Sequence, residues 1–138
     1  MLQPALSASG WRLTRKYGMR ESWKTVWITG ASSGLGLELA GLLDGNVDHV
    51  AISARPSDRL KRAEKRGKSL KAYPLDVTDA NAVSECVRAI EKGGGPIDLA
   101  VLNAGVWHPM KSDEMDLNKV RSSINVNYMG DMKAVDAL

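Results

Sequence analysis

The chain has 138 residues, 43% of them hydrophobic and 25% charged, a composition typical of one globular domain that excludes disordered, collagen-like and low-complexity chains. No apolar stretch reaches the length of about 18 residues that a membrane-spanning helix needs, so we expect no membrane partner. One cysteine, Cys86, excludes an internal disulfide, and with only two histidines beside it we expect no metal site. The low cysteine count is typical of a reducing compartment, and we expect a cytoplasmic protein.

The net charge of +3 is unevenly distributed along the chain. Residues 1–24 carry five basic side chains and one acidic one, and residues 55–71 carry eight basic and two acidic ones. Basic segments of this kind bind nucleic acid in some proteins, but residues 55–71 contain no aromatic side chains that would stack on bases. We therefore interpret the segment as a solvated helix face and expect no nucleic-acid partner.

Residues 1–22 show no apolar period and lack the apolar core of a secretory signal. Their acid-poor composition with Arg, Lys and Ser is also found in organellar transit peptides, an alternative that stays open. Because termini without packing partners stay disordered, we predict a flexible tail, followed by a single domain over residues 23–138.

From Lys24 onward, short apolar runs alternate with longer amphipathic segments. The apolar runs predict four strands: Thr25–Thr29, His49–Ser53, Leu70–Leu75 and Ile97–Leu102. The amphipathic segments predict four helices: Leu35–Leu43, Ser57–Arg66 with Ser57 as N-cap, a helix from Thr78 or Asp79 to about Glu91, and a last helix from about Leu117 to the end of the chain. This order, with near-continuous apolar strands, is typical of a doubly wound parallel α/β sheet with helices on both faces. Right-handed crossovers then predict the strand order 3-2-1-4.

A glycine-rich turn, TGASSGLG at Thr29–Gly36, joins the first strand to the first helix. Gly30 permits a tight turn, Gly34 lets a phosphate approach the backbone, and Gly36 allows close packing of the helix on the sheet. Free N–H groups at the start of the helix attract a pyrophosphate. The turn therefore predicts a dinucleotide site. Its expected cofactor-binding residues are Gly30, Ser32, Ser33, Gly34, Leu35 and Gly36.

Dinucleotide sites select their ribose about 20 residues past the glycine turn, at the end of the second strand. A carboxylate there binds the free 2′-hydroxyl of NAD, but this chain has Ala54 and Arg55. Arg55 is suited to a 2′-phosphate, and no carboxylate at this position repels that phosphate. We therefore predict NADP as the cofactor in preference to NAD, although a solvated arginine at a strand end explains the same residue.

Three further motifs occur in order: Asp76-Val77 after the third strand, Asn103-Ala104-Gly105 after the fourth, and Asn127-Tyr128-Met129-Gly130 in the last helix. With the glycine turn they resemble the short-chain dehydrogenase/reductase family over nearly the whole chain from Lys24 onward. The resemblance covers only the N-terminal, cofactor-binding half of a family domain. It implies a Rossmann-type fold and hydride transfer between NADP(H) and a carbonyl or secondary alcohol.

The resemblance also implies roles for single residues. Asp76 would bind the adenine amino group, and Val77 would lie beside the ring. Asn103-Ala104-Gly105 would line the cofactor and stabilise the central sheet, and Asn127 would be the catalytic asparagine that anchors a water in the family's proton relay. Simpler interpretations stay open: Asp76 caps a turn, Asn103-Ala104-Gly105 is only a strand exit, or Asn125 takes the relay role.

Three other side chains have expectations of their own. His108 comes after the fourth strand near the expected cofactor, and we interpret it as a surface-loop histidine rather than a substrate-pocket residue. Cys86 is expected to be a small packed side chain in a helix. Trp27 is expected in the core, where its indole N–H needs a partner.

The sequence departs from the family in its catalytic residues. The family uses a serine after strand five and a Tyr-x-x-x-Lys pair, in which the tyrosine transfers the proton and the lysine lowers its pKa. None of Tyr17, Tyr73 and Tyr128 has a lysine four positions later. We expect a Rossmann-type sheet that is truncated after the fourth strand and the helix that follows it. We expect the chain to be catalytically inactive alone.

We expect the complete protein to act on a small-molecule carbonyl or alcohol and to form a homo-oligomer. One alternative is a non-catalytic NADP-binding sensor or regulatory module. The other is a truncation product that folds poorly. By the resemblance, substrate specificity resides mostly in the C-terminal half of a family domain.

Overall fold

The structure, a computed structural model, describes residues 23–138. Its elements in chain order are β1 (Thr25–Thr29), α2 (Gly34–Leu43), β2 (His49–Ala54), α3 (Asp58–Glu64), β3 (Leu70–Pro74), α4 (Ala80–Gly94), β4 (Leu99–Val101), α5 (Leu117–Ile124), the π-helical turn η1 (Asn125–Met129) and α6 (Gly130–Ala137). The predicted N-terminal tail, residues 1–22, lies outside the described residues. In the part of the chain that the structure describes, no helix is both long and apolar enough to cross a membrane.

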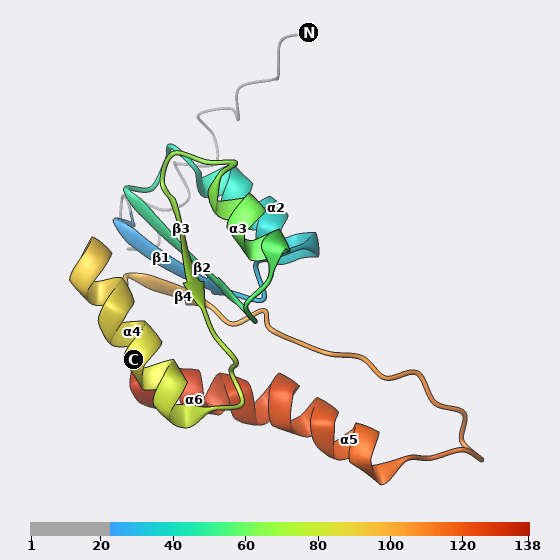
Figure 1. The fold of residues 1–138 in the computed structure, drawn as a ribbon. Coiled ribbons are helices and arrows are strands. Elements are labelled where there is room, and N and C mark those ends of the chain that lie inside the picture. Colours follow the sequence, from blue (N-terminus) through green and yellow to red (C-terminus); the bar gives the residue numbers. More distant parts are fainter. Residues whose placement is uncertain (1–22) are drawn as a thin grey trace, which may run out of the picture.

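The strands form one parallel sheet in the order β3-β2-β1-β4, which confirms the order predicted from right-handed crossovers (Figure 1). Strand β1 lies between β2 and β4, and all five of its residues are buried. Helices α2 and α3 cover one face of the sheet, and α4 and α6 cover the other (Figure 1). The predicted doubly wound, Rossmann-type α/β architecture is therefore confirmed.

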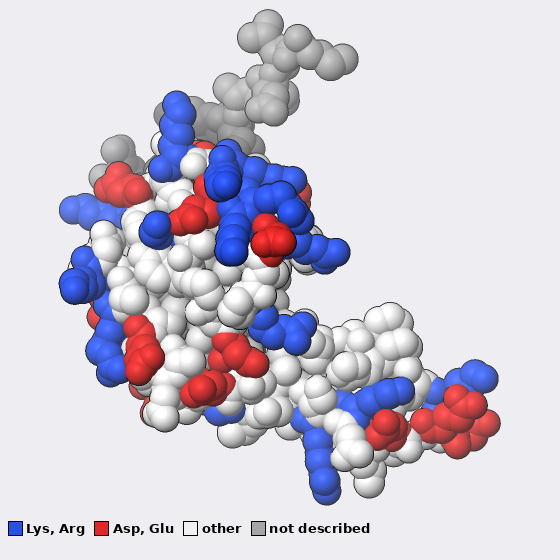
Figure 2. Space-filling view, in the orientation of Figure 1, with Lys and Arg blue, Asp and Glu red and all other residues white. Residues whose placement is uncertain are grey.

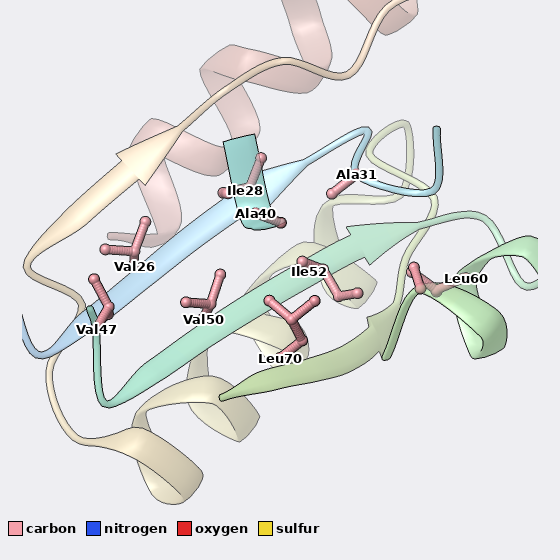
Figure 3. Close-up of a cluster of buried hydrophobic side chains, with 10 residues drawn as sticks. Val26, Ile28, Ala31, Ala40, Val47, Val50, Ile52, Leu60 and Leu70 are labelled. Atoms are coloured by element: carbon pink, nitrogen blue, oxygen red, sulfur yellow. The ribbon is translucent and has the colours of Figure 1, made fainter. Parts of the chain in front are cut away.

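The side chains of β1 alternate between the two faces of the sheet, because successive strand residues point to opposite sides. Val26 and Ile28 lie in the cluster that includes Leu60 of α3 (Figure 3). Trp27 lies in the other cluster, against α4 and α6. Its buried indole N–H donates a hydrogen bond to Ser53 Oγ of β2 at 2.9 Å. The partner that the sequence requires for Trp27 is thus supplied by the neighbouring strand.

The predicted starts of α3 and α4 are supported by local capping. Ser57 Oγ accepts a hydrogen bond from the N–H of Leu60 at 3.3 Å, and Asp79 accepts two from the first turn of α4. Helix α4 ends at Gly94, and its C-cap residue Gly95 has a φ of +85°, which side chains disfavour. Cys86 in α4 is buried as expected, and burial raises the pKa of its thiol.

Helix α3 ends at Glu64 instead of Arg66, and α4 extends to Gly94 instead of about Glu91. Two other elements differ more from their predicted extents. Strand β4 contains only Leu99–Val101, and these residues are half-buried because β4 pairs only with β1. The last helix is divided by the π-helical turn Asn125–Met129. Apolar periodicity does not reveal such a turn, because one wider turn leaves the helix direction and most of its amphipathic pattern intact.

Candidate cofactor-binding site

An open cleft of about 1390 Å3 lies at the carboxyl ends of the strands. Its walls come from the segments after all four strands and from α3, α5 and η1. They comprise Gly30, Ser32, Ser33, Ser53, Ala54, Arg55, Pro56, Ser57, Asp58, Arg59, Arg62, Leu75, Asp76, Val77, Thr78, Ala104, Gly105, Val106, His108, Asn118, Arg121, Ser122, Asn125 and Val126. Figure 2 shows the molecule hollowed between the basic cluster over α3 and the arm that carries α5. In open α/β sheets, ligands bind at this end, where the strand order reverses.

The glycine turn has a backbone shape that requires glycine. Gly30 and Gly34 have φ values of +68° and +59°, which side chains disfavour. A Cβ at Gly30 would lie 2.8 Å from Cα of Ala104, and one at Gly36 would lie 2.7 Å from Nδ2 of Asn103. A Cβ at Gly34 would meet nothing within 4 Å. Gly30 and Gly36 therefore allow close contact with the segment after β4, while the space around Gly34 is open.

The start of α2 is available to an anion. Ser33 is the N-cap residue, but its side chain makes no capping hydrogen bond among the described residues. The N–H groups of the first turn thus lack the acceptor that a serine cap usually supplies. Ser32 and Ser33 line the cleft, whereas Gly34, Leu35 and Gly36 do not. Leu35, in the first turn of the helix, is 83% exposed.

Asn103 joins the ends of β1 and β4. Its backbone N–H donates to Thr29 Oγ1 at 2.9 Å, and its Nδ2 donates to the carbonyls of Thr29 and Gly30 at 3.2 and 3.3 Å. The N–H of Ala104 donates to the same Oγ1 at 3.0 Å. Asn103 does not line the cleft, but Ala104 and Gly105 do. This motif is therefore more than a strand exit, because its asparagine fixes the glycine turn from behind.

Asp76 lines the cleft and also shapes the turn after β3. Its Oδ1 accepts hydrogen bonds from the N–H of Thr78 at 2.9 Å and from Oγ1 of Thr78 at 2.7 Å. These bonds, with smaller contributions from the charges of Arg55 and Lys133, hold the pKa of Asp76 below its ordinary value. The carboxylate thus stays ionised at the cleft. The turn-capping interpretation of Asp76 is confirmed, and its side chain remains beside the site.

Helix α6 is fixed against this same turn. A Cβ at Gly130 would lie 2.8 Å from Cγ2 of Val77, so glycine lets the helix approach the buried valine that lines the cleft. Lys133 Nζ donates to the carbonyl of Thr78 at 3.0 Å and to Oδ1 of Asn125 at 3.4 Å. The lysine therefore connects two walls of the cleft.

The two asparagines of η1 have different partners. Asn125 lines the cleft and Asn127 does not. The side-chain amide of Asn127 pairs with the backbone of Val106 in the segment after β4. Single π-helical turns within α-helices are frequent at functional sites, and this turn directs the two side chains to different surroundings.

Several cleft residues are missing from the prediction based on sequence. Those that bear polar or charged groups are Ser53, Ser57, Asp58, Arg59, Arg62, Thr78, His108, Asn118, Arg121, Ser122 and Asn125. His108, expected on a surface loop, does lie in a coil segment, but Nε2 lies 3.3 Å from Ser122 Oγ and the residue lines the cleft. The basic composition of residues 55–71 is visible in the sequence, but the charge pattern does not reveal which of its arginines face the cleft.

Comparison with protein families matches residues 24–138 to the profile described as "short chain dehydrogenase". Dehydrogenase/reductase SDR family member 7 of Mus musculus is 34% identical over 125 residues, which covers 82% of this chain and 37% of that protein. 3-dehydrosphinganine reductase TSC10B of Arabidopsis thaliana is 33% identical, with 81% of this chain and 34% of that protein covered.

Solved structures show the same similarity. A short-chain dehydrogenase/reductase from Serratia marcescens superposes with a TM-score of 0.75 at 26% identity, over 83% of this chain and 49% of that one. A putative short-chain alcohol dehydrogenase from Sinorhizobium meliloti gives a TM-score of 0.75 at 30% identity, over 84% of this chain and 48% of that one. The chain thus spans between about one third and one half of these proteins. Its sequence and its fold place it in the short-chain dehydrogenase/reductase family of oxidoreductases, whose cofactors are NAD(P) and whose substrates are small molecules.

Proposed function

We propose that this chain is the NADP-binding half of an oxidoreductase that transfers hydride between NADP(H) and a carbonyl or secondary alcohol. The observation that carries the cofactor choice is Arg55 at the carboxyl end of β2, where it lines the cleft in the position at which NAD sites place a carboxylate. Relatives named 3-dehydrosphinganine reductase support an oxidoreductase activity.

The residues around the cleft fit a dinucleotide. The turn Gly30–Gly36 and the first N–H groups of α2 suit the pyrophosphate. Gly34 has no side chain and open space around it, and the Ser33 side chain does not cap the N–H groups. Asp76 and Val77 lie where the adenine is expected, and Asn103 holds the turn in shape. When bound, NADP supplies or accepts the hydride at its nicotinamide ring. The cleft residues would bind and orient NADP, and the hydrogen bonds from Thr78 keep Asp76 ionised.

The chain itself is proposed to be inactive. Its 138 residues include no Tyr-x-x-x-Lys, the pair whose tyrosine transfers the proton in the family. Asn127 is proposed to support the proton relay of the complete enzyme by anchoring a water. That complete enzyme is proposed to be a cytoplasmic homo-oligomer acting on a small molecule, without nucleic-acid or membrane partners.

A second candidate is a non-catalytic NADP-binding sensor or regulatory module, which would bind the cofactor in the same cleft without hydride transfer. The codons beyond position 138 of the gene distinguish the two candidates. A reading frame that continues into a Tyr-x-x-x-Lys motif supports the enzyme. A stop codon directly after Leu138 supports the sensor or a truncation product that folds poorly.

The cofactor proposal is tested by calorimetric titration of the chain with NADPH and with NADH. The native chain is expected to bind NADPH more tightly, and Arg55→Ala should weaken NADPH binding roughly tenfold to a hundredfold, the effect of losing a charge-assisted hydrogen bond. Arg66→Ala is the matched control, because Arg66 belongs to the same basic segment but lies outside the cleft. Equal losses for both cofactors in Arg55→Ala would contradict the 2′-phosphate assignment.

A further inference from the structure

Only part of the basic segment 55–71 faces the cleft. Three of its four arginines, Arg55, Arg59 and Arg62, line the cleft. The fourth arginine, Arg66, and the four lysines of the segment do not. Arg59 and Arg62 are three residues apart in α3, so they share one face of the helix, next to the buried residues Leu60 and Ala63. Figure 2 shows the basic side chains gathered over α3 at the edge of the hollow.

The ion pairs of the segment do not involve the arginines of α3, and Arg55 interacts electrostatically with the Asp76 carboxylate across the cleft. The two acidic side chains of the segment associate with lysines: Asp58 with Lys61 at 3.9 Å, and Glu64 with Lys71 at 3.0 Å. No arginine of the cleft wall on α3 forms an ion pair with another described residue. Like charges that face one hollow repel one another in the free protein, and a bound anion removes that cost.

The chemistry of arginine indicates which anion suits this wall. A guanidinium is planar, weakly hydrated and able to donate two parallel hydrogen bonds to a phosphate, whereas an ammonium acts as a point charge. A terminal phosphate monoester carries close to two negative charges at neutral pH and accepts hydrogen bonds on three oxygens. A single Arg55 leaves part of that charge and some of those oxygens without a partner.

We infer that Arg59 and Arg62 act with Arg55 as a three-arginine clamp for the 2′-phosphate of NADP. Arg59, in the first turn of α3, shares the phosphate with Arg55, and Arg62 adds its charge from the next turn. The inference rests on the proposed cofactor and goes beyond it, because it distributes cofactor selection over α3 instead of one residue at the end of β2.

The test measures binding, so it does not depend on catalysis. NADPH and NADH are titrated into the chain and into Arg55→Ala, Arg59→Ala, Arg59→Lys, Arg62→Ala and Arg66→Ala, with thermal melts to verify folding. Arg59→Ala should weaken NADPH binding roughly tenfold and leave NADH binding within about twofold. Arg59→Lys should weaken NADPH binding less than Arg59→Ala, because lysine retains the positive charge but cannot donate two parallel hydrogen bonds to the phosphate. Arg62→Ala should have a smaller effect that fades as salt is raised, and Arg66→Ala should have none.

Adenosine 2′,5′-bisphosphate and adenosine 5′-phosphate provide a second comparison that isolates the 2′-phosphate. Arg59→Ala should reduce binding of the bisphosphate alone. If Arg59→Ala and Arg62→Ala bind NADPH as the native chain does while Arg55→Ala does not, the clamp is overturned and the cofactor proposal stands. If Arg55→Ala affects both cofactors equally, both proposals fail. If the α3 arginines instead govern binding of a single-stranded oligonucleotide and leave NADPH unaffected, the clamp is overturned in favour of a nucleic-acid surface.

Discussion

Asn127 and Val106 form a closed pair of hydrogen bonds between η1 and the segment after β4. Oδ1 of Asn127 accepts from the N–H of Val106 at 2.7 Å, and its Nδ2 donates to the carbonyl of Val106 at 2.9 Å. A side-chain amide is the neutral group that imitates a backbone partner on both sides, because it offers one acceptor and one donor. Asn127 therefore holds the segment after Gly105 in place on the helix.

Asn127→Ala should free this segment without unfolding the sheet. The loss of two solvent-exposed hydrogen bonds is expected to cost about 1–2 kcal/mol and to speed amide exchange at Val106. Asn127→Asp retains the acceptor, so it should protect the Val106 amide better than Asn127→Ala. Asn125→Ala is the matched control from the same turn, and hydrogen exchange resolved by residue is the measurement. Unchanged exchange at Val106 in Asn127→Ala would contradict the positioning role.

Gly34→Val should abolish cofactor binding and leave the sheet folded. The φ of +59° at Gly34 costs a side chain about 1–2 kcal/mol, and a branched side chain there would occupy the approach to the backbone that the pyrophosphate needs. Gly41→Ala is the control in the same helix, because a Cβ there meets nothing within 4 Å. It should bind normally and gain up to about 1 kcal/mol of stability. Normal NADPH binding by Gly34→Val would mean that the phosphate binds elsewhere.

Gly130→Ala should loosen the wall that Val77 forms. Its Cβ would lie 2.8 Å from Cγ2 of Val77, so one of the two must move, at an expected cost of about 1–3 kcal/mol partly offset by helix propensity. The double variant Gly130→Ala/Val77→Ala removes the conflict. Chemical denaturation of the four species gives the coupling energy, which should be favourable for the pair of alanines. Additive effects in this cycle would show that the contact is not responsible.

The stability of the domain should fall as the pH is lowered below the ordinary pKa of histidine. Burial, and secondarily the charge of Lys71, lowers the pKa of His49 from its usual 6.5, while Nε2 lies 2.9 Å from the hydroxyl of Tyr73. Because the pKa of His49 is lower in the folded chain, the unfolded chain binds the proton more readily. The stability that neutral His49 contributes is therefore fully present above pH 6.5 and is lost progressively as the pH falls below that value. A second loss is expected in acid, where Asp44 and Asp76, whose pKa values are lowered by hydrogen bonds, take up protons.

The free energy of unfolding, measured between pH 8 and pH 5 for the native chain and for His49→Gln, tests the first step. Gln has the hydrogen-bonding groups to contact Tyr73 but does not titrate, so the variant should lack the histidine-linked decrease. His108→Gln removes the other histidine and should retain the decrease. A His49→Gln chain with the native pH dependence would assign the effect to other groups.

Self-association is expected from the apolar side chains that α5, η1 and α6 expose. Ile124, Tyr128 and Val135 are 52%, 60% and 57% exposed, and β4 offers a half-buried edge nearby. Sedimentation velocity should detect species larger than a monomer as the concentration rises. Val135→Lys should shift the equilibrium toward the monomer more than Leu42→Lys, a substitution at an apolar residue that is 67% exposed on α2. A monomer at every concentration would contradict this expectation.

The layered α/β fold, the strand order and the places where glycine is required were predictable from the order of residues. Each depends on local rules: apolar runs form strands, the handedness of crossovers orders them, and a glycine turn before a helix opens a site at the carboxyl ends. The residue order also indicated that Asn103 belongs to the site. It did not reveal that Asn103 acts from behind the glycine turn, through Thr29 and Gly30, because that contact joins strands far apart in the sequence.

Which side chains face the cleft depends on tertiary packing. The basic segment resembles a uniformly solvated helix in sequence, yet packing of Leu60 and Ala63 onto the sheet turns Arg59 and Arg62 toward the hollow. In the same way, the π-helical turn separates Asn125 from Asn127, and the path of the segment after β4 brings His108 to Ser122. The rotation of a helix about its axis is fixed by the element against which its buried face packs. The pattern of charges in the sequence does not identify that element.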